Sequence, residues 1–403
     1  MSFPLEDWQA YAATGPAPEL LSVPLQPTVA DLAALRKDHS QGVVAVAVEA
    51  ARARNRGASK LAPELVERLI ADEQGVMVAS SSMAASYKAS CLVRAGAREV
   101  LDLCCGIGAD AFELAGAGLA VTVVDRDPVR AWMAAHNARC QAITDDVSSP
   151  AVLERISGNL VHLDPSRRDD RKRRHDYASY QPGPETIARI VGAAAGACVK
   201  LGPGVDFSLP PAPEGSFIEL LSEQGRLTQA LLWTGSLAIA RGIEAGHRVA
   251  TLLPSGERYG ARPGPLIDLE DWYESSGPER PVLEYVYEAD AALERGSLLG
   301  AFAREHGLRP IHPAVGVLTG ESAIDSPWLT RFEVIDAMPW RSKAVKKRLR
   351  ELNAGIVAVK TRAKVVEPDA LQKDLRGKGD RELVVFVLKL GAKATAIIGE
   401  RSA

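Results

Sequence analysis

Short apolar runs alternate with segments of helical periodicity in the middle of the chain. The apolar runs have the length of buried strands; they are Val100 to Cys104, Ala120 to Val124, Cys140 to Ile143, Leu160 to Leu163 and Ala197 to Leu201. Apolar residues recur every three to four positions in the segments between them, at 109–116, 128–139 and 184–195. Alternating buried strands and helices predict a Rossmann-like, doubly wound α/β sheet.

Two glycines directly follow the first of these strands. Cys105-Gly106-Ile107-Gly108 predicts a tight turn, because glycine adopts backbone angles that a side chain forbids and lets a ligand approach the main chain. The second strand ends in Asp125, which follows Asp102 of the first strand by 23 residues. An acid at that point is placed to hydrogen-bond the two hydroxyls of a ribose. The sequence therefore predicts a nucleotide-binding turn.

The composition of the turn favours a cationic ligand over a pyrophosphate. A pyrophosphate site has the pattern Gly-x-Gly-x-x-Gly, whereas Ala111 occupies the third glycine position and Asp110 would face the phosphates. Asp102 suits an ammonium group such as that of S-adenosylmethionine, which we expect as the cofactor. The residues expected around it here are Asp102, Cys104, Gly106, Gly108, Asp125 and Arg126. The alternative is a glycine turn that serves packing alone.

Acidic and basic residues follow the next two strands, at the edge where a parallel sheet binds ligands. Asp145 and Asp146 follow the third strand, and one of them, with Asp145 preferred, is expected to accept a hydrogen bond from the adenine amino group. After the fourth strand, Asp164 is placed to orient the methyl acceptor. Arg167 and Arg168 offer forked donors for phosphate or carboxylate. These last three are the expected catalytic residues.

Two further groups are expected to contact the substrate. Six of the eight residues in 167–174 are Lys or Arg, which predicts a polyanionic substrate with Arg171 among its contacts; a solubilising surface loop is the alternative. Tyr87 and Lys88 precede the first strand. They either line the same pocket or pack as a buried tyrosine and a lysine whose stem covers apolar surface.

The flanking segments predict a helical region, the α/β domain and a separate tail domain. Helical spacing recurs at 31–37, 43–54 and 63–71, with Thr28 as a cap and Pro63 in a first turn. Strand patterns at 227–233 and 248–253 resemble an antiparallel sheet edge, and the prolines and glycines of 254–265 indicate a linker. The expected domains are 1–90 (helical), 91–254 (α/β) and 266–403 (α+β).

The tail is basic within a slightly acidic chain. The whole chain has a net charge of −3, whereas residues 340–393 contain 15 Lys and Arg against 6 Asp and Glu. Strand patterns at 281–287, 330–335, 355–360 and 383–390 surround a predicted basic helix at 342–353. Lys346 and Lys347 of that helix, followed by Lys360, Arg362 and Lys364, indicate a nucleic-acid face. A solvated helix is the alternative.

Composition excludes several classes of protein. The chain has 403 residues, 46% hydrophobic and 25% charged, as expected for two or three globular domains. Its five cysteines form no Cys-x-x-Cys pair, which argues against a zinc site and a disulfide framework. The apolar runs are far shorter than a membrane span, and the N-terminus lacks a signal-peptide pattern. We expect a soluble cytoplasmic protein without a metal or membrane partner; the oligomeric state stays open.

Several short sequences resemble a known family. Val-Leu-Asp-Leu-Cys-Cys-Gly-Ile-Gly at 100–108, Asp-Pro-Ser-Arg-Arg at 164–168 and Lys-Leu-Gly-Pro-Gly at 200–204 resemble the bacterial class I methyltransferases that carry a C-terminal THUMP-like domain. Tyr285 to Asp290, Pro327 to Val334 and Leu383 to Phe386 are similar to that domain. The resemblance implies an S-adenosylmethionine-dependent enzyme and, because THUMP-bearing proteins modify RNA, an RNA substrate.

The loop after the fourth strand departs from related enzymes. Those that methylate exocyclic amines carry an aromatic residue where Ser166 and Arg167 stand, and 5-methyluridine methyltransferases need a cysteine after the fifth strand, within which Cys198 lies. The target atom therefore stays open. We expect a methyltransferase that acts on RNA, either tRNA or rRNA. The alternatives are a small-molecule or protein methyltransferase whose tail is an interaction module, and a non-catalytic RNA-binding protein with a relict cofactor fold.

Overall fold

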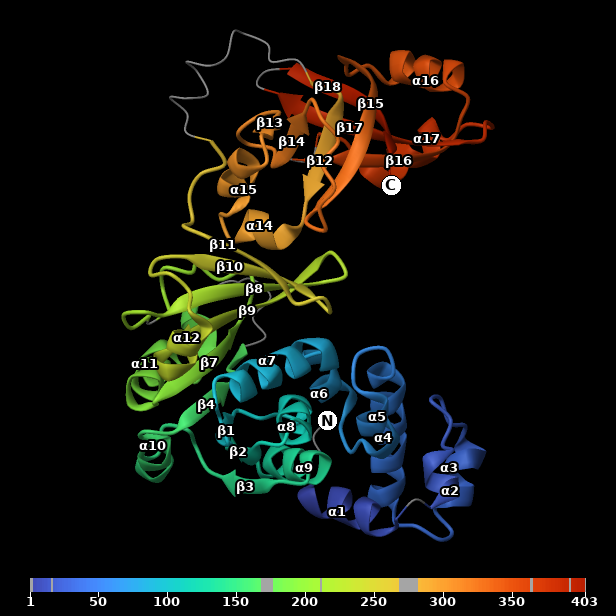
Figure 1. Ribbon diagram of the computed structural model, residues 1–403. Coiled ribbons are helices and arrows are strands. Elements are labelled where there is room, and N and C mark those ends of the chain that lie inside the picture. Colours follow the sequence, from blue (N-terminus) through green and yellow to red (C-terminus); the bar gives the residue numbers. More distant parts are fainter. Residues whose placement is uncertain are drawn as a thin grey trace. The chain divides into compact units, whose positions relative to one another are not determined.

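The computed structural model describes residues 3–15, 17–167, 177–210, 212–267, 282–362, 365–390 and 393–402. Contacts between residues divide the chain into two compact units. The first unit consists of Met1–Glu223, Thr228–Gly246 and Leu253–Glu257, and the second of Gln224–Leu227, His247–Leu252 and Arg258–Ala403. Figure 1 labels the helices and strands of both.

A helical region opens the first unit. Its helices are α1 (Leu5–Ala13), α2 (Pro18–Leu21), α3 (Val29–Leu35), α4 (Gln41–Gly57), α5 (Pro63–Arg68), α6 (Glu73–Val78) and α7 (Ser82–Arg94). The helices predicted at 31–37, 43–54 and 63–71 are confirmed as α3, α4 and α5. The local signals were also correct, since Thr28 forms a capping box with Asp31 and Pro63 stands in the first turn of α5.

A nine-stranded sheet is doubly wound with an antiparallel edge. Its strands, in spatial order, are β11 (Glu257–Ala261), β10 (Arg248–Leu253), β8 (Phe217–Glu223), β9 (Arg226–Thr234), β7 (Gly196–Leu201), β4 (Leu160–Leu163), β1 (Glu99–Leu103), β2 (Ala120–Asp125) and β3 (Gln141–Thr144). The five strands from β7 to β3 are parallel, and β9 runs antiparallel to β7. The chain order reverses between β1 and β4, which is where doubly wound sheets bind ligands. The predicted Rossmann-like fold is confirmed.

Helices lie on both faces of this sheet (Figure 1). They are α8 (Ala109–Gly116), α9 (Pro128–Ala138), α10 (Pro150–Ile156), α11 (Pro184–Ala193) and α12 (Gly235–Arg241). Helices α8 and α9 pack together, as do α10 and α11. A small ribbon of β5 (Ser166–Arg167) and β6 (Tyr180–Gln181) follows β4.

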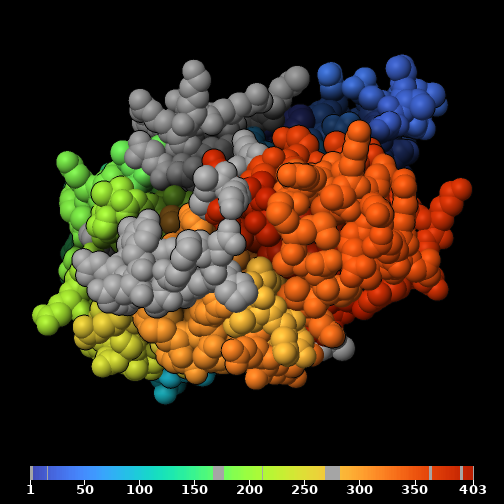
Figure 2. All heavy atoms as spheres, turned by 90° about the horizontal axis from the view of Figure 1, so that it is seen from above, coloured from blue at the N-terminus to red at the C-terminus, as the bar shows by residue number. Residues whose placement is uncertain are grey.

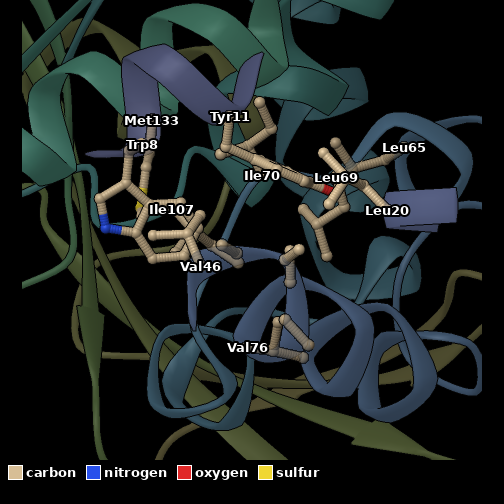
Figure 3. Close-up of a cluster of buried hydrophobic side chains, with 14 of the residues drawn as sticks. Trp8, Tyr11, Leu20, Val46, Leu65, Leu69, Ile70, Val76, Ile107 and Met133 are labelled. Atoms are coloured by element: carbon tan, nitrogen blue, oxygen red, sulfur yellow. The ribbon is translucent and has the colours of Figure 1, made fainter. Parts of the chain in front are cut away.

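One hydrophobic cluster joins the helical region to the glycine turn. Trp8 of α1, Val46 of α4 and Ile70 pack with Ile107 of the turn and Met133 of α9, as Figure 3 shows. Since Ile107 stands between the two turn glycines, this packing holds the turn from the side of the helical region. The helices before the sheet are therefore part of the support of the turn.

Two features of this sheet differ from the sequence expectations. Strand β8 was missed; it is buried almost throughout although it contains Glu219. The segment predicted as a linker, 254–265, contains the passage from the first unit to the second at Glu257 and Arg258, but part of it also forms β11 at the edge of the nine-stranded sheet. Pro254 and Gly256 lie in the turn between β10 and β11, so the residues that indicated a linker make a hairpin.

The second unit contains a seven-stranded sheet. Its strands, in spatial order, are β13 (Arg309–Pro310), β14 (Val317–Gly320), β12 (Tyr285–Ala289), β15 (Leu329–Pro339), β18 (Lys393–Arg401), β17 (Arg381–Leu390) and β16 (Ala354–Thr361). Its helices are α14 (Ala291–Arg295), α15 (Leu299–Glu305), α16 (Ser342–Glu351) and α17 (Pro368–Leu375). In Figure 2, much of the face shown is formed by residues of this unit, coloured gold through orange to red.

Strand β17 is buried on both faces, and its residues alternate between two cores. Leu383 and Val385 pack with Val345 and Leu349 of α16, whereas Phe386 packs with Phe332 on the opposite face. The strand patterns predicted at 330–335, 355–360 and 383–390 and the helix at 342–353 are confirmed as β15, β16, β17 and α16. Strand β18 was missed; hydrogen bonding to β15 and β17 on either side stabilises its small residues as a strand.

The side chain of Asn137 provides the first prediction. It is fully buried, donates to the carbonyl oxygens of Ile70 and Ile107 (2.9 Å each) and accepts from the Ile70 N–H (3.1 Å). Asn137→Ala leaves three buried backbone groups unpaired and is expected to lower the free energy of unfolding by about 3 kcal/mol. Urea unfolding measures this. Asn55→Ala, on the exposed face of α4, is the control; equal stability of the two variants contradicts the assignment.

Candidate functional site

Backbone hydrogen bonds bring the carboxyl ends of the parallel strands to one place. The Cys104 N–H donates to the backbone carbonyl oxygen of Val124 in β2 at 2.8 Å. The Asp145 N–H donates to the backbone carbonyl oxygen of Asp125 at 3.1 Å, and the Asp164 N–H to that of Leu103, the last residue of β1, at 3.2 Å. The residues predicted from four strand ends therefore share one edge of the sheet.

The two glycines of the turn have different roles. Gly108 has φ +79°, and a Cβ there would lie 2.6 Å from the Cα of Ala134 in α9. Gly106 has φ +56°, but a Cβ there would meet no described heavy atom within 4 Å. Packing therefore requires Gly108, whereas Gly106 borders open space. Cys104 is also left-handed, with φ +58°, and burial raises the pKa of its thiol well above the usual value.

Asp125 lies beside this turn as a half-buried carboxylate. Its Oδ2 accepts a hydrogen bond from the Gly106 N–H at 3.2 Å, and its Oδ1 accepts one from the Asp127 N–H at 3.0 Å. Burial raises the pKa of the Asp125 carboxyl. The turn and the acid predicted to bind one ligand are thus in direct contact.

The two acids after β3 are in different environments. Asp145 is half-buried; its Oδ1 accepts from the Asp146 N–H and its Oδ2 from the Ser149 hydroxyl, both at 2.7 Å. Asp146 is exposed, and hydrogen bonds from Ser148 lower the pKa of its carboxyl. Both oxygens of Asp145 are thus engaged in the loop, and Asp146 is the more accessible acid.

Arg126 is exposed, and its guanidinium donates to Gln181 of β6 at 3.1 Å. Arg167 belongs to β5, where its partner in β6 is Tyr180. Arg168 and Arg171 lie outside the described residues. The ribbon of β5 and β6 therefore borders the loop after β2.

Asp164, the predicted acceptor-orienting residue, is paired with a lysine. Its Oδ2 lies 2.7 Å from the Nζ of Lys200, the penultimate residue of β7, and both side chains are partly exposed. The Oδ1 of Asp164 accepts no hydrogen bond from the described part of the chain. Sequence reasoning had given Lys200 no role, although a lysine near the end of an apolar strand was a visible signal.

A buried polar network lies beneath the turn. Asp102 is 1% exposed and its Oδ1 lies 2.7 Å from Nδ1 of His162; Nε2 of His162 lies 3.2 Å from Nζ of Lys88. Lys88 in turn is 2.5 Å from Asp110, whose other oxygen accepts a hydrogen bond from Ser80. Asp102, expected to contact the cofactor, is thus an interior group, and its Oδ2 has no partner among the described residues.

The expectation that Asp110 faces the ligand was wrong. Its carboxylate is 9% exposed and paired with Lys88. Burial opposes the charge of Asp110, but the ammonium of Lys88 outweighs it and holds the pKa of that carboxyl well below its usual range. Burial likewise opposes the charge of Lys88, and Asp110 raises the pKa of that amine in return. Since the Lys88 ammonium can only donate, Nε2 of His162 accepts and Nδ1 donates to Asp102.

Tyr87 lies in the interior, as the packing alternative proposed, whereas Lys88 fits neither alternative, because its ammonium is itself buried and paired with Asp110. The Tyr87 hydroxyl donates to Glu219 at 2.5 Å, and Arg241 donates to the same Glu219 oxygen at 2.6 Å. The Trp233 indole N–H donates to the other oxygen of Glu219 at 2.7 Å. Burial and Glu219 raise the pKa of the Tyr87 phenol. This second network joins α7 to β8, β9 and α12.

The basic helix of the second unit is only partly available to a ligand. Lys346 is paired with Asp374 of α17 at 2.6 Å, whereas Lys347 is 80% exposed and lies 3.9 Å from Glu351. Arg341, Lys343 and Arg350 are exposed as well. Lys360 and Arg362, predicted to continue this face, are both paired with Glu288, and Lys364 lies outside the described residues.

Other kinds of site are not found in the described residues. The described part of the chain contains no group of three or more His, Cys, Asp or Glu side chains that could hold a metal ion. Within the same residues, no helix is long and apolar enough to cross a membrane. The five cysteines, all of them described, are unpaired, and Cys198 is fully buried.

Comparison with known proteins identifies similar chains. Residues 329–401 match the family described as THUMP domain-like. Two Mycobacterium tuberculosis proteins from different strains, Rv3037c and MT3122, are each 30% identical to this chain over 354 residues, or 86% of this chain and 92% of theirs. Both are described as uncharacterised S-adenosylmethionine-dependent methyltransferases. A Porphyromonas gingivalis crystal structure, assigned as a methyltransferase, has the same fold: TM-score 0.73, 16% identity, 99% of this chain and 98% of that chain.

The buried ion pair provides the second prediction. Lys88→Met leaves Asp110 as an uncompensated buried charge and is expected to lower the free energy of unfolding by about 3–5 kcal/mol. The double variant Lys88→Met/Asp110→Asn is expected to recover part of that loss, because the unpaired charge is removed. Urea unfolding measures the stability of both variants, and Lys343→Met, at an exposed position of α16, is the control. If the double variant is less stable than Lys88→Met alone, the charge is not the cause.

Proposed function

The chain belongs to the S-adenosylmethionine-dependent methyltransferases, and we propose that it transfers a methyl group to RNA. The observation that carries this proposal is the set of exposed cations Lys343, Lys347 and Arg350 of α16, with exposed Arg341 directly before the helix, within the THUMP-like region 329–401. Exposed cations on one helix bind a phosphate backbone without regard to base sequence. The small-molecule and protein alternatives have no comparable observation in their favour.

The residues at the edge of the first unit fit the cofactor. Asp125 presents a carboxylate beside the turn, and the space next to Gly106 is open because a Cβ there would touch nothing within 4 Å. Burial raises the pKa of Asp102, whose Oδ2 has no partner among the described residues, and a cationic ligand above the turn would favour the charged form of that carboxyl. An adenosyl group with a positive charge matches these three features.

We assign the cofactor contacts accordingly. Asp125 accepts hydrogen bonds from the ribose hydroxyls, and the backbone of Cys104 to Gly108 contacts the amino-acid end of S-adenosylmethionine. Asp146, the exposed acid after β3, is the better candidate for the adenine amino group, because both Asp145 oxygens already accept hydrogen bonds. Asp102 acts from the interior through its charge and by orienting His162.

S-Adenosylmethionine supplies an electrophilic methyl group. The chain's contribution is then to position the acceptor, which accounts for much of the catalysis of a displacement reaction. Asp164, oriented by Lys200, offers its free oxygen to an N–H of the acceptor. A covalent route through cysteine has no support at Cys198, because the side chain is fully buried and burial raises the pKa of its thiol.

The cofactor assignment provides the third prediction. Asp125→Ala removes a charged acceptor of hydrogen bonds and is expected to weaken S-adenosylmethionine binding by about 2–3 kcal/mol, or roughly 30- to 150-fold. Isothermal titration calorimetry measures this. Asp127→Ser is the matched control: it removes a charge two residues away but keeps an oxygen to cap α9. Equal losses in the two variants would mean that only the local charge matters.

The RNA assignment provides the fourth prediction. Lys343→Glu/Lys347→Glu changes two exposed cations of α16 and is expected to weaken RNA binding about tenfold or more and to reduce its salt dependence. S-Adenosylmethionine affinity should not change. Fluorescence anisotropy with labelled tRNA and rRNA fragments at several salt concentrations measures this. The control Arg36→Glu/Lys37→Glu, at exposed positions after α3, makes the same change in net charge. An equal loss of RNA affinity in this control contradicts a specific role of α16.

A further inference from the structure

The end of α6 lies next to the acceptor edge. Lys60 donates to two of the last carbonyl oxygens of α6, at 2.9 Å each. Lys200 lies 3.4 Å from the carbonyl oxygen of Val78 and 2.7 Å from Asp164. The negative end of a helix attracts cations, which accounts for both lysines. Lys200 therefore lies between the end of α6 and Asp164, the acid proposed to orient the acceptor.

The side chains at this end of α6 are apolar and exposed. Met77 is 56% exposed and Val78 is 63% exposed. Among the described residues, they are the one pair of exposed large hydrophobic residues adjacent in sequence. Exposed apolar surface at a ligand edge is typical of a binding site.

The segment that carries these residues is held in place. Directly after it, the Ser80 hydroxyl donates to Asp110 at 2.8 Å and the Ser81 hydroxyl donates to Glu223 at 2.7 Å. Lys60 and Lys200 also donate hydrogen bonds to carbonyl oxygens of this segment. Met77 and Val78 therefore belong to a fixed wall and are not the tip of a loose loop.

We propose that Met77 and Val78 are the apolar wall against which the target base of the RNA lies. The free oxygen of Asp164 accepts a hydrogen bond from the edge of that base, and Lys60 binds the phosphate of the same nucleotide. This inference rests on the proposed function. It also supplies the apolar surface that a base extruded from its stack requires, which the loop after β4 lacks because Ser166 stands where related enzymes have an aromatic residue.

Burial has a larger effect on the charge of Lys60 than the two cations and two anions around it. Burial lowers the pKa of Lys60 to about 8, with Lys200 and Arg56 contributing, while Glu223 and Asp164 act in the opposite direction. A phosphate next to Lys60 would stabilise the ammonium form. Nucleotide binding should therefore weaken as the pH rises through about 8, where Lys60 loses its proton, and Lys60→Arg should remove that dependence.

The first test places a tryptophan in the wall. Val78→Trp and, as a control, Ile239→Trp on exposed α12 are saturated with S-adenosylhomocysteine and titrated with each of the four nucleoside 5′-monophosphates. Stacking of a base on Trp quenches its fluorescence. Saturable quenching is expected in Val78→Trp and not in Ile239→Trp, weaker at pH 9 than at pH 7. Equal quenching in both variants, or none, overturns the proposal.

The second test separates this inference from the proposed function. Met77→Ser/Val78→Ser is expected to lower kcat/KM for cellular RNA about tenfold, measured with labelled S-adenosylmethionine, while affinity for the cofactor is unchanged by calorimetry. Ile239→Ser should match the unaltered protein. If the Met77→Ser/Val78→Ser variant methylates RNA at the rate of the control, the proposed contact between these two residues and the target base is wrong. Label that enters protein or small molecules, and no RNA, instead overturns the proposed function, and the quenching experiment then decides whether the wall binds a base.

Discussion

The buried ion pair between Lys88 and Asp110 is the interaction on which the first unit depends. It joins α7 to the first turn of α8, directly after the glycine turn, and both side chains are almost completely removed from water. Through His162 the same network reaches Asp102, so β1 and β4 are connected as well. A buried pair of this kind is not more stabilising than apolar packing, but it tolerates few alternative arrangements, because any of them leaves a charge unpaired.

The same network lies between the two groups of residues that we propose as the site. The ends of β1, β2 and β3 carry the turn, Asp125 and the acids after β3, whereas the ends of β4 and β7 carry Asp164 and Lys200. The two halves meet between β1 and β4, the strands that the buried network ties together. The helical region contributes to both: Ile107 packs into its core, and Lys60 and Lys200 hold the end of α6 beside Asp164.

Fewer lysines and arginines of the second unit are available to bind an anion than its composition indicates. Lys346, Lys360 and Arg362 are paired with acidic side chains of the same unit, and Arg348 is paired with Asp336. What remains exposed is a narrower set on one face of α16. An electrostatic surface is thus defined by which cations keep their hydration, and a count of lysines and arginines overestimates it.

The sequence alone determined the local features of this protein. The strand, glycine turn, helix and acid of 100–125, the cap at Thr28 and the strand at 383–390 all follow from interactions between residues close in sequence or from the pattern of apolar residues. The tertiary structure decided which polar groups meet. His162 lies 60 residues from Asp102, and Lys60 and Lys200 meet at α6 from different elements. Asp110 looked like a ligand-facing acid until its partner was known. Hydrophobic pattern specifies that a residue is buried, but the partner of a buried charge depends on how distant elements pack, which no local pattern records.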